Sequence, residues 1–203
     1  DWTSYGTTNG VDTINWQTIA WSPDLGIFCA IGAKDTGKLM ISSDGINWTL
    51  YSNVSSVDET TWQSITWSPL LGIFCAVGGS SGTDRAMTSS DGINWTTHTT
   101  NSIDDYDSWR SVTWSPELEI FCAVGNGNIA SANRVMVSSD GVKWTYYNGD
   151  DGAGAYSWSS VVWSPDLSIF CAISASPNVM ISSDGVSWTV YSGSTYGIDN
   201  NYW

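Results

Sequence analysis

The sequence predicts an all-β protein built from four copies of one small antiparallel sheet. A tryptophan that begins each copy recurs at intervals of 46, 47 and 49 residues, a period typical of repeat architectures. Trp, Thr, Ser, Val, Ile and Gly dominate the chain and favour strands, whereas there are only three Glu among 203 residues. Each copy also contains a short run, such as Ile-Phe-Cys-Ala-Val, that would be apolar on both faces of a strand.

The second copy shows the expected order of elements. A strand over residues 62–67 ends at Ser-Pro-Leu-Leu-Gly, in which Pro and Gly suit a hairpin turn. A second strand covers 73–77, a third covers 86–88, and a fourth runs from Trp95 to about His98. Ser-Ser-Asp-Gly between the third and fourth strands predicts a tight turn. We name these strands a, b, c and d.

Strand b predicts how the four sheets are arranged. Ile73, Cys75 and Val77 point to one face of the sheet, whereas Phe74 and Ala76 point to the other. A sheet that is apolar on both faces packs between two other sheets, and four such sheets around an axis form a four-bladed β-propeller. A five-bladed propeller with one incomplete blade is the alternative.

We expect a single domain over residues 1–203, with repeats at about 16–61, 62–108, 109–157 and 158–203. Residues 1–5 match strand d and the last residues match the run into strand a, so we expect the ring to close between the two ends of the chain. Either residues 1–5 or the strand around Trp188 would form the outer edge of blade four.

Charge and cysteine usage limit the partners and the chemistry. A net charge of −14 disfavours nucleic acid and anionic membranes, and no apolar run approaches the length of a membrane span.

Each copy has one cysteine at the same position, and equivalent positions are too far apart for disulfides, so we expect four buried free thiols. The sequence starts at Asp1 without Met, which fits removal of a leader or cleavage from a longer chain, and we expect a secreted or extracellular location. The cysteines are Cys29, Cys75, Cys122 and Cys171.

The Ser-Ser-Asp-Gly turns, each followed three residues later by Trp, resemble the Asp-box or BNR repeat in a shortened form. The resemblance implies a β-propeller in which the turn aspartates have a structural role away from the ligand face. These residues are Asp44, Asp91, Asp140 and Asp184. The sialidase site of that family does not carry over, because Arg85 and Arg134 occupy one repeat position in different blades. Repeat length and tryptophan use are more distantly similar to the tachylectin-type propeller lectins.

The b–c and d–a loops share one face of a propeller and hold the variable segments, so we expect ligands to bind there. Basic residues lie two positions before the strand-c Met in three copies, and acidic residues lie four positions before the leading Trp in the same copies. These pairs predict either a scaffold ion pair or a polar clamp on sugar hydroxyls. The leading tryptophans would be core residues or would stack on sugars. The candidate ligand-binding residues are Trp16, Trp62, Trp109, Trp158, Asp12, Asp58, Asp105, Lys38, Arg85 and Arg134.

We therefore expect a non-enzymatic, multivalent carbohydrate-binding protein whose partners are glycans, with no cofactor and no metal site. The only histidine, His98, is expected at the surface, and the adjacent acids in the loops are typical of solvated residues. A structural or protein-binding propeller, such as a surface adhesin or virion component, is the alternative. A glycosidase, with two carboxyl groups in one cleft, is the third hypothesis.

Overall fold

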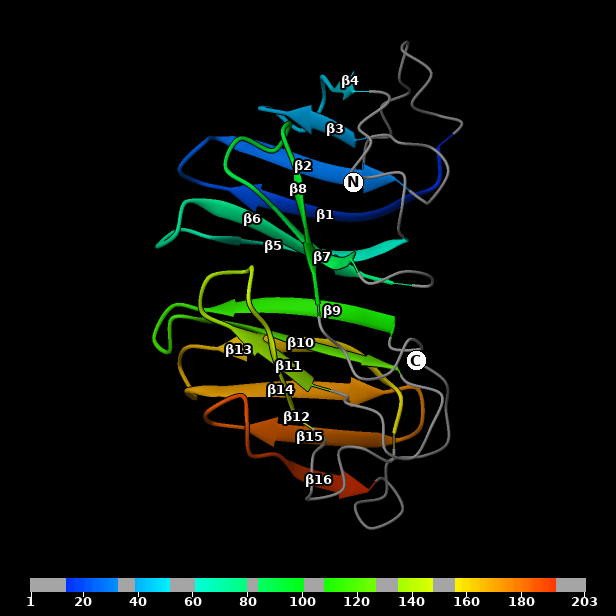
Figure 1. The fold of residues 1–203 in the computed structure, drawn as a ribbon, viewed down its shortest axis with the longest axis vertical. Coiled ribbons are helices and arrows are strands. Elements are labelled where there is room, and N and C mark those ends of the chain that lie inside the picture. The colour runs from blue at the N-terminus through cyan, green and yellow to red at the C-terminus, as the bar shows by residue number, and fades with distance from the viewer. Residues whose placement is uncertain are drawn as a thin grey trace, which may run out of the picture.

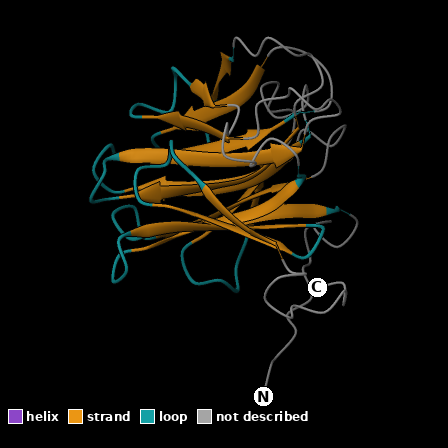
Figure 2. Ribbon diagram, turned by 90° about the horizontal axis from the view of Figure 1, so that it is seen from below, coloured by secondary structure: helices purple, strands orange, loops and turns teal. Residues whose placement is uncertain are grey.

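A computed structural model describes residues 14–32, 39–51, 61–79, 84–100, 108–126, 135–147 and 156–192. Within these ranges the chain forms four antiparallel sheets of four strands each, which follow one another in sequence order (Figures 1 and 2). The predicted all-β fold of four propeller blades, each with four antiparallel strands, is confirmed. The described ranges hold no helical segment with the length and hydropathy of a membrane crossing.

Each blade contains strands a to d in order, from the inner strand to the outer edge. The inner a strands are β1 (Trp16–Ser22), β5 (Trp62–Ser68), β9 (Ser108–Ser115) and β13 (Trp158–Ser164). The b strands are β2 (Ile27–Gly32), β6 (Ile73–Gly78), β10 (Ile120–Asn126) and β14 (Ile169–Ser174). The c strands are β3 (Leu39–Ser42), β7 (Asp84–Ser89), β11 (Val135–Ser138) and β15 (Asn178–Ser182). The outer d strands are β4 (Thr49–Tyr51), β8 (Thr96–Thr99), β12 (Thr145–Tyr147) and β16 (Thr189–Ser192).

The outer edge of blade 4 is β16, the strand that follows Trp188. It pairs antiparallel with β15, and Val179 lies opposite Tyr191. Residues 1–5, the other candidate for this edge, lie outside the described residues.

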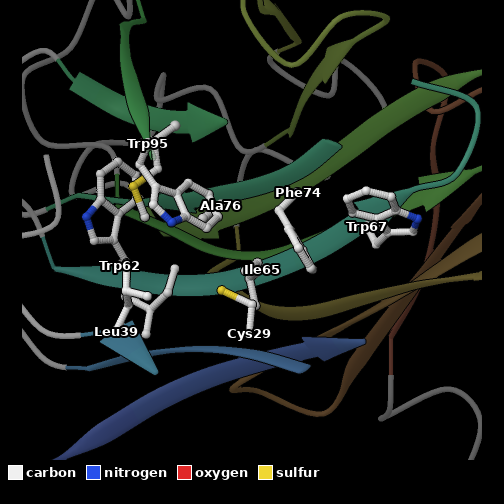
Figure 3. Packing of buried hydrophobic residues seen from close by; sticks show 10 residues of the cluster. Cys29, Leu39, Trp62, Ile65, Trp67, Phe74, Ala76 and Trp95 are labelled. Atoms are coloured by element: carbon white, nitrogen blue, oxygen red, sulfur yellow. The ribbon is translucent and has the colours of Figure 1, made fainter. Parts of the chain in front are cut away.

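Each blade has two apolar faces, which we name the Trp face and the Cys face. The Trp face of blade 2 consists of Trp62, Ile65, Trp67, Phe74, Ala76, Met87 and Trp95. The Cys face of blade 1 consists of Cys29, Ile31 and Leu39, bordered by Ala20, Ile27, Ile41 and Tyr51. These two faces pack together, with Cys29 beside Ile65 and Leu39 beside Trp62 (Figure 3). The equivalent faces of blades 2 and 3, and of blades 3 and 4, pack in the same way.

The four blades form an arc, with blade 1 at the top and blade 4 at the bottom of the long axis in Figure 1. β1 packs against β5, β5 against β9, and β9 against β13. Ile19 on the Trp face of blade 1 is 54% exposed, whereas its counterpart Ile65 is 6% exposed, and Val162 on the Cys face of blade 4 is 57% exposed. Among the described residues, the expected closure between blades 4 and 1 is therefore not seen.

The second strand-a tryptophan of a blade reaches the a–b turn of the preceding blade. The indole N–H of Trp67 donates to Asp24 Oδ2 at 2.9 Å, and that of Trp163 donates to Glu117 Oε2 at 2.6 Å. At the equivalent junction between blades 2 and 3 the turn carries Leu70, and the buried indole N–H of Trp114 has no hydrogen-bond partner in the described structure. One junction therefore lacks a hydrogen bond that its neighbours have.

We predict that Leu70→Glu stabilises the protein by about 1 kcal/mol, because the new carboxylate accepts from the buried Trp114 indole. Leu70 is 58% exposed, so replacing it removes little apolar contact. The urea midpoint measures the change. Leu71→Glu adds the same charge at the neighbouring position and serves as the control, and an equal shift in both variants would contradict the assignment.

Candidate binding face

The four Ser-Ser-Asp-Gly turns between strands c and d share one hydrogen-bond pattern. In the second copy, Oδ1 of Asp91 accepts from the backbone N–H groups of Ile93 and Asn94, both at 2.8 Å. The Ser89 hydroxyl donates to the same oxygen at 3.0 Å. The other turn aspartates accept equivalent bonds; they are Asp44, Asp140 and Asp184. These side chains therefore bond within their own turns.

The turn hydrogen bonds hold the aspartates in the charged form. Partial burial raises the pKa of Asp91, but the bonds from Asn94 and its neighbours lower it by more, to about 2. The pKa of Asp44 is also lowered, mainly by the backbone N–H of Asn47. Partial burial raises the pKa values of Asp140 and Asp184, and the turn hydrogen bonds again outweigh it and lower them. All four turns therefore depend on ionised carboxylates.

We predict that the protein loses stability in acid through these turns. A carboxyl whose folded pKa lies below its unfolded value near 3.9 contributes fully above about pH 4, and the contribution is lost as the pH falls toward 2. Asp91→Asn should cost about 1 kcal/mol at neutral pH, since the group is partly solvated, and should weaken the pH dependence below pH 4. Urea unfolding from pH 6 to pH 2.5 measures both effects. Glu119→Gln, at an exposed turn carboxyl, is the control; an unchanged acid slope in Asp91→Asn contradicts the assignment.

The leading tryptophans, predicted as core or as sugar-stacking residues, are mostly core. Trp62, Trp109 and Trp158 are 0% exposed, so none of the three has a ring face available to a ligand. A β-bulge follows Trp62, with the register shifting between Trp62 and Ser64, and the extra residue turns Trp62 to the same face as Ile65. Trp16 is half-buried because it lies on the uncovered Trp face of blade 1.

The predicted ion pairs fall largely outside the described residues. Lys38, Arg134, Asp12, Asp58 and Asp105 all lie in segments that the structure does not describe. Their described member, Arg85, is 3% exposed at the start of β7, and Asn178 holds the same repeat position in blade 4 with 7% exposure. A side chain at this position is therefore set into the blade rather than extended into solvent.

Polar side chains pair at the strand ends of the b–c and d–a face. The Thr99 hydroxyl donates to Asp84 Oδ1 at 2.8 Å across the two outer strands of blade 2. The Ser157 hydroxyl donates to Asn126 Oδ1 at 2.8 Å and joins blade 4 to blade 3. The Ser108 hydroxyl donates to the carbonyl of Gly79 at 2.9 Å and joins blade 3 to blade 2.

Sequence reasoning missed these polar pairs. Residues with a hydroxyl precede the leading Trp in three copies, and this recurrence is the signal that could have found the blade-to-blade bonds. The three residues are Thr61, Ser108 and Ser157.

The cysteines and the histidine of the described structure are all at least partly buried. The four cysteines are free, as predicted. Burial, and to a smaller extent the negative charge of nearby Asp91, raises the pKa of Cys29 to about 12. His98 is half-buried rather than at the surface: its Nε2 lies 2.7 Å from the Thr88 hydroxyl, and burial lowers its pKa. In the part of the chain that the structure describes, no three His, Cys, Asp or Glu side chains gather as metal ligands would.

The fold is similar to solved β-propeller structures, although no family model and no curated protein matches the sequence. Streptogramin B lyase matches with a TM-score of 0.67 and 10% identity over 90% of this chain and 56% of that chain. A catalytically inactive variant of virginiamycin B lyase from Staphylococcus aureus, with quinupristin, matches with a TM-score of 0.68 and 12% identity over 92% and 57%. YCF48 bound to a D1 peptide matches with a TM-score of 0.55 and 13% identity over 88% and 53%. The chain spans a little over half the length of these structures.

These matches correct one expectation. The chain was predicted to have no enzymatic activity, and the structures that share its fold include two lyases. At 10–12% identity the likeness shows the fold alone, but a fold that carries catalysis in other chains gives no ground for excluding it. The prediction of a non-enzymatic protein is therefore contradicted.

Proposed function

We propose that this propeller binds carbohydrate on the b–c and d–a face. The observation that carries the proposal is the contrast between the two faces. The turn face repeats one pattern in which the aspartates bond within their own turn, whereas the strand ends of the other face differ from blade to blade and present fixed polar pairs. A carboxylate or amide oxygen beside a hydroxyl can accept from and donate to the hydroxyls of a sugar.

The burial of the leading tryptophans changes how a sugar would be held. Stacking on Trp62, Trp109 or Trp158 is not part of the proposal, because these rings have no exposed surface. Hydrogen bonds between the sugar hydroxyls and groups such as Asn126, Ser157 and Asp84 supply the recognition instead. A net charge of −14 repels sialylated and sulfated glycans, so the proposed ligands are neutral glycans.

A glycan array with the purified, folded chain tests this function. We expect retention of neutral glycans, and weaker retention after Asn126→Ala, which removes the amide of the Asn126–Ser157 pair. Val142→Ser, on the turn face, is the control and should bind like the original chain. Retention of no neutral glycan by a folded chain would overturn the proposal.

A polypeptide is the second candidate ligand. The specific observation in its favour is that the same fold, in YCF48, has been solved with a bound peptide. Blade-to-blade variation also suits one extended ligand that makes a different contact at each blade. Selection from a displayed peptide library would favour this candidate if enriched peptides lost binding in Asn126→Ala and not in Val142→Ser.

A further inference from the structure

The chain leaves one Trp face and one Cys face uncovered, and the two are complementary. Each interior junction packs the Trp face of one blade on the Cys face of the blade before it. In the described structure, the Trp face of blade 1 and the Cys face of blade 4 lack this packing. Trp21 on the first is 43% exposed against 7% for Trp67, and Ile173 on the second is 44% exposed against 0% for Val77.

A comparison of Gly45, in the tight turn of blade 1, with its counterpart in blade 2 shows which side chains would cover the Trp face of blade 1. A Cβ on its counterpart Gly92 would lie 3.4 Å from the side chains of Ile27 and Ile41 in the preceding blade. A Cβ on Gly45 would contact only Phe28 of its own blade, at 3.6 Å. Ile169 and Ile181 of blade 4 hold the repeat positions of Ile27 and Ile41 and are both partly exposed, so they are the side chains that fit this place.

Polar groups on the two faces are also matched. Backbone N–H groups of Ile65, Val112 and Val161 each donate to a strand-a hydroxyl of the preceding blade, at 3.0–3.1 Å. The hydroxyls are those of Thr18, Ser64 and Ser111. The remaining pair in this series is the N–H of Ile19 and the hydroxyl of Ser160. Likewise, Trp67 and Trp163 donate to acids of the preceding a–b turn, and the remaining pair is Trp21 and Asp166.

We propose that two copies of this chain assemble head to tail into one closed ring of eight blades, four from each chain. The Cys face of blade 4 in each copy packs on the Trp face of blade 1 in the other. An interface between different surfaces of identical chains closes when the rotation between copies divides a full turn, and a half turn does so with two copies. Eight blades lie within the usual range of propellers.

The curvature of the arc supports two copies. This chain covers 56% and 57% of the length of the two lyase structures, so one arc of four blades corresponds to a little over half of either. Two arcs together therefore supply slightly more chain than either of those structures contains. One chain cannot close by itself in this form, because blades 1 and 4 lie at opposite ends of the long axis (Figure 1).

The mass in solution tests the proposal. Light scattering behind size exclusion, and native mass spectrometry, should give twice the 22.0 kDa of one chain across a wide concentration range. A mass of one chain throughout that range would overturn the proposal, and so would a series of masses above two chains, which would indicate an open row of arcs.

Charged substitutions on the uncovered faces test the interface itself. Ile19→Asp and Val162→Asp should each convert the dimer to single chains that remain folded, because both side chains are exposed in one arc. Circular dichroism and cooperative urea unfolding check the fold. Leu71→Asp, 38% exposed in a turn of blade 2, is the matched control and should remain a dimer. Dimers in both interface variants would contradict the proposed contact.

Cys171 reports on the same interface without a mutation in it. Cys29, Cys75 and Cys122 are 0% exposed, whereas Cys171 on the Cys face of blade 4 is partly exposed in a single arc. Closing the ring would bury it, so we expect its reaction with a thiol reagent to be at least about tenfold slower in the original chain than in Ile19→Asp. Equal rates in the two proteins would overturn the proposal, as would a protected Cys171 in a species with the mass of one chain.

Discussion

Phe121→Ala is expected to cost about 3–5 kcal/mol of folding free energy, the largest effect of a single substitution that the structure predicts. Phe121 is 0% exposed on the Trp face of blade 3, and its ring centroid lies 4.7 Å from that of Trp114 and 6.3 Å from that of Trp144. Removing the ring leaves a cavity between two indoles that β9 and the tight turn hold in place. Urea unfolding followed by tryptophan fluorescence measures the loss.

Phe28 holds the same repeat position in blade 1 and provides the matched control. Its ring lies at similar distances from Trp21 and Trp48, 4.5 Å and 6.2 Å, but it is partly exposed because no blade covers it in one arc. In the Val162→Asp background, which we expect to be a single chain, Phe28→Ala should cost less than half as much as Phe121→Ala. Equal costs in that background would contradict the assigned difference in burial.

Gly141→Ala is expected to destabilise the protein by about 2–4 kcal/mol, through backbone strain and a clash between blades. Gly141 has φ +74° in the tight turn of blade 3, a conformation that suits glycine. An added Cβ would lie 2.9 Å from the Thr88 side chain and 3.5 Å from Ile73, both in blade 2. Thermal and urea unfolding measure the loss of stability.

Gly45→Ala separates the strain from the clash. Gly45 has the same φ of +74°, but its added Cβ meets only Phe28, at 3.6 Å. In the single-chain Val162→Asp background we therefore expect the cost of left-handed strain alone, about 1–2 kcal/mol. A larger loss in Gly45→Ala than in Gly141→Ala would show that packing between blades is not the cause.

The repeat period and the two-faced strand b were enough to predict the fold, because both are local patterns repeated four times. Strand ends agreed within a few residues: residues 73–77 were predicted and Ile73–Gly78 is observed. Trp62 was harder, since simple alternation places it on the opposite face from Ile65. The bulge after Trp62 depends on how β5 pairs with β6, which the sequence of one strand does not reveal.

Ring closure was not predictable from the repeat either. Trp21 and Trp67 occupy the same repeat position, yet the first is 43% exposed and the second 7%. The difference comes from position in the arc, because blade 1 packs against Trp67 whereas Trp21 lies on the uncovered Trp face of blade 1. The candidate binding face was predicted only as a location, because its loops differ from copy to copy and the candidate pair of Lys38 and Asp12 lies outside the described residues.

The tight turn between strands c and d forms its hydrogen bonds within its own repeat. Asp91 completes its bonds within a few residues of its own position, and the same holds in the other three copies. A duplicated repeat would therefore form the same turn, and it would pack its Trp face on the Cys face of the blade before it. Addition or loss of a whole repeat would leave the hydrogen bonds of the remaining turns intact.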